Sequence, residues 1–173
     1  MTALADIPTV LLTGARGAGK TTLLAALLER APAEARIAVL LTEVGDSRLP
    51  PPRPGVTVAA AEPGCICCVG QVGLRVALTR LLREARPERL YVELTEPAHL
   101  AASLRTLRSP WLAPVLRLDA VIGVADGSMT RPDEAFAAWL EPLTALELRN
   151  DAGGVLAAFA RVRRPGLAIG PVA

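Results

Sequence analysis

Residues 9–28 read TVLLTGARGAGKTTLLAALL and fall into three parts of different character. The first part, residues 9–13, is apolar and contains β-branched side chains, which favours a short buried strand. Residues 14–19 form a glycine-rich turn, and residues 21–30 are dominated by leucine and alanine, the composition of a helix. The start of the chain is therefore predicted to be a strand, a turn and a helix in that order.

The same alternation continues along the chain. Further strands are predicted at 37–41, 56–58, 89–94 and 118–125, and further helices at 72–85, 98–108 and 133–148, the last with a break at Pro142. The proline-rich stretch 42–55 is expected to be an exposed loop, because prolines do not join the interior of a sheet. Strands that alternate with helices predict an α/β fold, with a doubly wound, mostly parallel sheet covered by helices on both faces.

The length and charge of the chain limit the classes of function. A chain of 173 residues is expected to form a single domain over residues 1–173, although residues 151–173 show no clear pattern. Nineteen basic and seventeen acidic residues leave a net charge of +2, which does not favour nucleic acid or an anionic membrane as a partner. The N-terminus lacks the basic region of a signal peptide, and no apolar run reaches the roughly 18 residues of a membrane span. A cytoplasmic protein is expected.

Residues 14–21 match the phosphate-binding motif G-x-x-x-x-G-K-[ST] at every fixed position. In this motif backbone amides surround phosphate oxygens, the lysine reaches the β and γ phosphates, and the hydroxyl holds Mg²⁺. Lys20 is the only lysine of the chain, and a compact ammonium is not replaced by a guanidinium in a tight anion site. A glycine-rich turn without a ligand is the alternative. The predicted nucleotide-binding residues are Gly14, Gly17, Ala18, Gly19, Lys20, Thr21 and Thr22.

The three cysteines lie within four residues, at Cys65, Cys67 and Cys68, too tight and uneven a group for a disulfide framework. Three thiolates in one loop can supply three sulfur ligands to Zn²⁺ or another borderline cation, with a fourth ligand from elsewhere. Cys65 and Cys68 also have the C-x-x-C spacing of a redox pair, and three quietly packed thiols are a further alternative. The pattern favours metal binding over both.

A phosphate loop followed by Gly-Cys-x-Cys-Cys resembles the CobW-like family of P-loop GTPases and metallochaperones, over about residues 8–126. Residues 17–24 are similar to the first motif of that family, 42–45 to its acidic switch segment, 65–68 to its metal motif, 91–95 to its Walker B strand and 124–126 to a later strand that ends in aspartate. The motifs come in the same order. The resemblance ends before the C-terminal domain of the family, so a short member is expected.

The resemblance implies GTP hydrolysis coupled to delivery of Zn²⁺ or Co²⁺ to a client metalloprotein. It implies catalytic roles for Lys20, Glu43 and Glu93, and Mg²⁺ binding by Thr21, Glu43 and Glu93. A loop carboxylate and a strand-end surface charge are the plain alternatives for the two glutamates. Two other functions are kept open. One is a metal sensor or buffer that binds nucleotide without hydrolysing it, and the other is a small P-loop ATPase or kinase.

The chain departs from the family pattern in how it would recognise the base. Guanine-binding proteins of this kind use Asn-Lys-x-Asp, but the only lysine is Lys20 and the only asparagine is Asn150. Asn150 and Asp151 are assigned as a partial substitute, although a polar turn fits them equally well. The preference for GTP over ATP therefore rests on the resemblance alone.

A second departure lies after the Walker B strand, where Glu96 replaces the glycine that the family usually has. A carboxylate there would repel a γ-phosphate unless Glu96 points away or Pro97 remodels the loop. Otherwise hydrolysis is expected to be slow. His99, the only histidine, is interpreted as a polar residue at a helix start, with a fourth metal ligand as the alternative. Trp111 and Trp139 are interpreted as packing residues.

Overall fold

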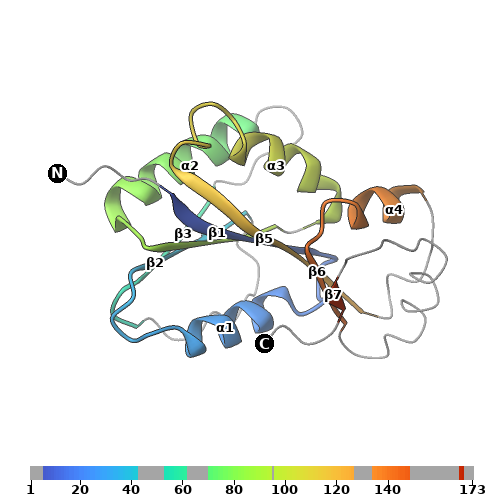
Figure 1. Cartoon of the computed structure of the whole chain (residues 1–173), viewed down its shortest axis with the longest axis horizontal. Helices are drawn as coiled ribbons and strands as arrows, with labels where there is room; N and C mark the ends of the chain where they lie inside the picture. Colours follow the sequence, from blue (N-terminus) through green and yellow to red (C-terminus); the bar gives the residue numbers. More distant parts are fainter. Residues whose placement is uncertain are drawn as a thin grey trace.

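The structure is a computed structural model that describes residues 6–42, 53–61, 70–94, 96–126, 134–148 and 168–169. Strands and helices alternate along these residues, as the sequence predicts (Figure 1). In chain order they are β1 (Ile7–Gly14), α1 (Lys20–Arg30), β2 (Ile37–Leu41), β3 (Val56–Ala60), α2 (Gly70–Ala85), β4 (Arg89–Glu93), the 3-10 turn η1 (Pro97–His99), α3 (Leu100–Leu107), β5 (Leu116–Ala125), α4 (Glu134–Leu140), β6 (Ala145–Leu148) and β7 (Ala168–Ile169).

The strands within the described residues form one seven-stranded sheet in the order β3-β2-β4-β1-β5-β6-β7. Every pair of neighbouring strands is parallel. The chain order reverses at β1, which lies between β4 and β5, so the predicted doubly wound parallel sheet is confirmed. In open sheets of this kind, ligands bind at the carboxyl ends of the strands near this reversal.

Helices cover both faces of the sheet. Helix α1 lies on one face, and α2 and α3 lie on the other (Figure 1). Leu23, Leu24 and Leu28 of α1 join one apolar cluster with β2 residues such as Val39. Leucines of α2 and α3 join a second cluster, together with three side chains of α4, Phe136, Trp139 and Leu140. All five residues of β2 are buried, as expected for a strand with a helical layer on each side.

The predicted helix over 133–148 is wrong in its second half. Helix α4 ends at Leu140, and residues 145–148 form β6, which pairs with β5 from Ile122↔Ala145 to Ala125↔Leu148. Pro142 ends the helix, because its ring removes a backbone donor. Alanine, leucine and glutamate favour helix in isolation, but pairing with β5 decides the structure here.

Three further differences concern lengths and exposure. Strand β5 begins at Leu116 rather than at residue 118, and a two-residue strand, β7, lies within the tail for which the sequence shows no pattern. Trp111 does not pack, because 73% of its surface is exposed. None of the helices in the described part of the chain combines the length and apolar character needed to cross a bilayer.

Two glycines in regular elements should respond to the same substitution in opposite ways. A Cβ on Gly123 of β5 would lie 2.5 Å from Leu143 Cδ1 and 3.0 Å from the Trp139 ring, both buried, so Gly123→Ala should lower the free energy of unfolding by about 1–3 kcal/mol. Gly73 of α2 has open space at the same position. Gly73→Ala should therefore raise the free energy of unfolding by about 0.5–1 kcal/mol. Urea denaturation measures both, and equal shifts would contradict the packing of Trp139 and Leu143 on β5.

Candidate functional site at the carboxyl edge of the sheet

The predicted phosphate loop lies where the three central strands end. In the parallel register Leu12 of β1 is level with Glu93 of β4, and Gly14 is level with Val124 of β5. The loop after β1 therefore meets the ends of β4 and β5 at one edge of the sheet. Asp126, which follows β5, and Lys20 lie close enough to interact electrostatically.

Glycine is required in the loop for two reasons. A Cβ on Gly14 would lie 2.1 Å from the Val124 carbonyl oxygen, so no larger residue fits between β1 and β5 there. Gly17 and Gly19 have φ of 81° and 99°, in the left-handed region that side chains disfavour. Gly19 caps α1 without a side-chain hydrogen bond, so the amides of the first helical turn face the loop. This arrangement suits a bound anion.

Lys20 is the first residue of α1, and its side chain is buried. Its Nζ donates hydrogen bonds to the carbonyl oxygens of Gly14 at 3.0 Å and Ala15 at 2.7 Å, so the side chain folds back over the loop. Burial lowers the pKa of the ammonium, and the Glu93 carboxylate partly opposes this effect. The loop therefore holds a single partly desolvated positive charge.

Thr21 and Glu93 connect α1 to β4. The Thr21 hydroxyl donates to Glu93 Oε1 at 2.7 Å. Glu93 is almost fully buried, and its second oxygen, Oε2, has no hydrogen-bond partner among the described residues. Burial raises the pKa of Glu93, while the hydrogen bond from Thr21 and the charge of Lys20 act in the opposite direction.

This pair of side chains fits Mg²⁺. Magnesium prefers hard oxygen ligands, and in nucleotide sites it is held by one or two protein oxygens besides the phosphates. Thr21 offers a hydroxyl oxygen, and Glu93 offers a carboxylate with one unused buried oxygen. The sequence prediction that these two residues act together is therefore compatible with where they lie, and their role stays a prediction.

Glu96 lies just outside this cluster. Its side chain is exposed, and the chain turns into η1 at Pro97, where the His99 amide bonds to the Glu96 carbonyl at 3.2 Å. Its charge still raises the pKa of Lys20 as a minor contribution. His99 lies at the start of α3, the place that the sequence predicts, and its buried Nδ1 has no hydrogen-bond partner within the described residues.

Other predicted site residues lie outside the described residues: Glu43, Cys65, Cys67, Cys68 and Asn150. The described ends of two of these segments are informative. The Thr42 amide bonds to the Glu93 carbonyl at 3.1 Å, and the Ala61 amide bonds to the Leu41 carbonyl at 2.8 Å. Both segments thus leave the sheet at the edge that carries the phosphate loop. Among the described residues alone, no group of three His, Cys, Asp or Glu side chains is placed to hold a metal.

One contact beneath the loop is not predicted from the sequence. The Trp139 indole N–H of α4 donates to the Thr13 hydroxyl at 3.1 Å, and both side chains are buried. Trp139 packs on Gly123 and lies 5.8 Å from Phe136, centroid to centroid. An isolated glycine within the strand-forming run VIGVA is the signal that could have indicated a close neighbour on β5.

Comparison with known proteins agrees with this geometry. Residues 8–148 match the model of the CobW/HypB/UreG nucleotide-binding domain. The chain belongs to this family. The match extends past the expected limit at residue 126 and includes β6.

Two curated proteins are similar to this chain in sequence. The zinc chaperone YeiR of Escherichia coli is 33% identical over 121 residues, which is 68% of this chain and 37% of the relative. The zinc-regulated GTPase metalloprotein activator 1 of Schizosaccharomyces pombe is 33% identical over 137 residues, or 71% of this chain and 32% of the relative. The chain thus spans about a third of the length of these two relatives.

A solved structure supports the fold. The Zn(II)-bound YjiA GTPase from Escherichia coli superposes with a TM-score of 0.65 at 20% identity, over 96% of this chain and 57% of that one. The chain therefore has the α/β fold of a P-loop NTPase.

The buried carboxylate predicts a dependence of stability on pH. Because the pKa of Glu93 is raised above 4.5, the folded nucleotide-free protein binds more protons than the unfolded chain between that value and the raised one. The free energy of unfolding should fall relative to that of Glu93→Gln as the pH rises through this window. Urea titrations across pH measure the difference. Thr21→Val removes a hydrogen bond to the carboxylate, so it should raise the pKa of Glu93 further and extend this pH window upward. An unchanged window would contradict the geometry.

The contact between Trp139 and Thr13 predicts coupling between two substitutions. Trp139→Phe leaves the buried Thr13 hydroxyl without its donor, and Thr13→Val leaves the indole N–H without its acceptor, so each should cost about 1–3 kcal/mol. The double variant should cost about 0.5–1.5 kcal/mol less than the sum. Thermal unfolding followed by circular dichroism provides the cycle. Exposed Trp111→Phe is the control, and strictly additive losses would argue against the hydrogen bond.

Proposed function

We propose that this chain is a Mg²⁺-dependent GTPase that binds zinc or cobalt through Cys65, Cys67 and Cys68 and delivers the metal to a client metalloprotein. The observation that carries the proposal is the 2.7 Å hydrogen bond from Thr21 to Glu93 beside the buried Lys20. The hydroxyl, the carboxylate and the ammonium thus lie together beside the loop after β1, at the carboxyl edge of the sheet. Similarity to a zinc chaperone and to a zinc-regulated GTPase metalloprotein activator supports both the metal and the nucleotide.

The loop would bind the phosphates through its own backbone. Left-handed Gly17 and Gly19 let amides turn inward, and the N-terminus of α1 adds its partial positive charge. Lys20 now bonds to two loop carbonyls, and it would exchange these for the β and γ phosphate oxygens. Phosphoryl transfer needs positioning and charge neutralisation rather than a covalent intermediate, and Lys20 supplies both.

Thr21 and Glu93 would hold the metal of the nucleotide, together with Glu43. When bound, Mg²⁺ neutralises the charge that develops on the transferred phosphoryl group. The Thr21 hydroxyl would turn from Glu93 toward the cation, and the free Oε2 of Glu93 would face the cation or its water. Glu96 places a further negative charge at the same edge, which makes slow hydrolysis the expected behaviour.

Nucleotide and transition metal would be coupled through the backbone at Glu93. Thr42, which precedes the segment with Glu43, bonds to the Glu93 carbonyl, and Ala61, which precedes the cysteine segment, bonds to Leu41 of the adjoining strand. A change at Glu93 when the γ-phosphate leaves would therefore reach the Glu43 segment through one backbone hydrogen bond, and the cysteine segment through β2 and a second one. Order and disorder of such segments is a common form of nucleotide switch.

The test is a metal titration by calorimetry on the reduced protein. Zn²⁺ and Co²⁺ are titrated in the presence of GDP, of a non-hydrolysable GTP analogue and of the matching ATP analogue. The proposal expects the affinity of the protein for Zn²⁺ or Co²⁺ to differ between the GDP-bound form and the form bound to the GTP analogue. The ATP analogue should not produce the change that the GTP analogue produces. Tight metal binding that ignores nucleotide would instead indicate a sensor or buffer. Absence of metal binding would leave a P-loop ATPase or kinase, and either result would overturn the proposal.

Two variants separate the two binding events. Lys20→Ala should weaken nucleotide binding on the order of 100-fold, because a buried charge partner is lost, and should leave Zn²⁺ binding in place. Cys67→Ala should weaken Zn²⁺ binding and leave GTP binding unchanged. Glu29→Gln, at the exposed far end of α1, is the control for both. Calorimetry and GTP turnover are the measurements, and wild-type turnover in Lys20→Ala would remove the enzyme from the proposal.

A further inference from the structure

Helix α2 has two faces of opposite character. Its inward leucines, Leu74, Leu78, Leu81 and Leu82, are buried in the core. Its outward face carries two rows of side chains spaced four residues apart, which run side by side along the helix. One row contains Arg75, Thr79 and Arg83, and the other contains Val72, Val76, Arg80 and Glu84.

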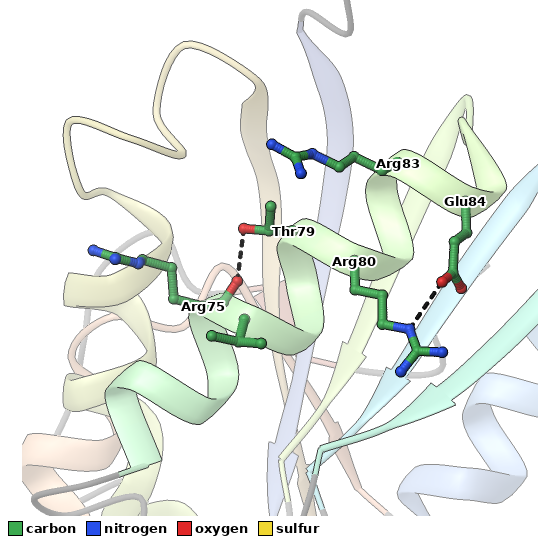
Figure 2. Close-up of a pocket in the computed structure, with 6 residues that line it drawn as sticks. Arg75, Thr79, Arg80, Arg83 and Glu84 are labelled. Atoms are coloured by element: carbon green, nitrogen blue, oxygen red, sulfur yellow. Dashed lines mark hydrogen bonds and ion pairs between the residues drawn. The ribbon is translucent and has the colours of Figure 1, made fainter.

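A groove runs between the two rows. It has a volume of about 420 Å³ and is lined by Arg75, Val76, Thr79, Arg80, Arg83 and Glu84. Figure 2 shows Arg75 and Arg83 reaching out on one side of the helix, and Arg80 and Glu84 on the other. A row of side chains on a partner helix packs into a groove of this kind.

Two exposed valines lie on this face of α2, and one of them, Val76, lines the groove. Val72 is 60% exposed and Val76 is 58% exposed. Among the described residues the other exposed large hydrophobic side chains are Val58, at 45%, and Trp111, at 73%. Two valines one helical turn apart, flanked by arginines, form the apolar centre and charged rim that protein interfaces have.

The charge of this face is positive. Arg80 is paired with Glu84 at 2.8 Å, but within the part of the chain that the structure describes neither Arg75 nor Arg83 contacts a carboxylate. The neighbouring α3 contributes Arg105 and no acidic residue. Since the whole chain carries only +2, this concentration of positive charge on one helical layer is local.

These observations identify the chemistry of the occupant. A second copy of this chain would place arginine against arginine, so self-association through this face is disfavoured. Thr79 donates its hydroxyl to the Arg75 carbonyl at 2.8 Å, so it is not available to a phosphate, and the two valines offer nothing to a polyanion. An acidic protein helix is complementary to both rows of side chains, with carboxylates opposite the arginines and small apolar side chains opposite the valines.

We propose that the outward face of α2 is the docking surface for an acidic amphipathic helix of the client protein. Arg75 and Arg83 are eight residues apart, about 12 Å along the helix, so the client helix carries two carboxylates seven or eight residues apart. Helix α2 begins at Gly70, so one end of the docked helix lies at a point of the chain only two residues in sequence from Cys68. The client role rests on the proposed function, whereas the docking surface does not.

A single helix on this face buries a small area, so the complex is weak and short-lived. A brief, salt-sensitive encounter suits delivery of a metal, because the partner has to leave after transfer. Charge pairs at the rim mainly set the rate and the specificity of such an encounter.

The test is an NMR titration of the full-length, isotope-labelled chain with a synthetic helical peptide of about 20 residues, long enough to be substantially helical. The peptide carries glutamates seven or eight residues apart and an alanine and leucine face. Its control has glutamine in place of each glutamate. The proposal expects shifts confined to α2, loss of binding at high salt and no binding of the glutamine peptide.

Charge reversal localises the contact. Arg75→Glu with Arg83→Glu should weaken the acidic peptide at least tenfold and leave GTP affinity unchanged, because neither residue touches the phosphate loop. The matched control is Arg30→Glu with Arg36→Glu, at the end of α1 and before β2, which should bind the peptide as the wild type does apart from a small general charge effect. Equal losses in both double variants, or shifts away from α2, would overturn the proposal.

Two further results decide between occupants. Tighter binding of a single-stranded oligonucleotide or of phosphatidylserine vesicles to the same face would overturn the protein helix as the occupant. In another outcome the peptide binds at α2 while nucleotide has no effect on the metal affinity of the chain. That result would support the docking surface and contradict the proposed role in metal delivery. The two proposals therefore fail separately.

Discussion

The buried charge of Lys20 is the constraint on which the site depends. An ammonium removed from water is costly unless polar groups surround it, and this chain supplies two carbonyls of its own loop and the nearby Glu93 carboxylate. Those contacts require the loop to curl over the end of α1, which in turn requires the left-handed glycines. They also require the end of β4 to lie beside the end of β1, as only a central position of β1 in a parallel sheet allows.

Much of the architecture follows from local patterns. Continuous apolar runs such as Ile37–Leu41 are typical of strands buried on both faces, and the strand-turn-helix around the phosphate loop is read directly from residues 9–28. Strand β6 is different. Its Ala-Leu-Glu-Leu sequence favours a helix, and only the open edge of β5 beside it makes a strand the better structure. Such a preference for a partner cannot be read from the segment itself.

The site likewise contains residues that the sequence indicates and contacts that it does not. The phosphate-loop motif indicated Lys20 and Thr21, and the resemblance to the family indicated Glu93; the structure brings these three side chains together across 72 residues of sequence. Glu43, the cysteines and Asn150 stay predictions from the sequence. The contact of Trp139 with Thr13 was not foreseen, because it joins residues 126 positions apart and follows no motif. Periodicity shows which face of an element is buried, but it does not show which buried polar groups meet.

The two tryptophans give the chain a built-in optical reporter. Trp139 is 4% exposed and hydrogen-bonded to the residue that precedes the phosphate loop, whereas Trp111 is 73% exposed at the opposite end of the strands. A water-soluble quencher reaches the second indole and not the first, so the fluorescence that survives quenching comes from beneath the loop. The packing beneath the loop can thus be monitored in the unlabelled protein, by light emitted from a single side chain.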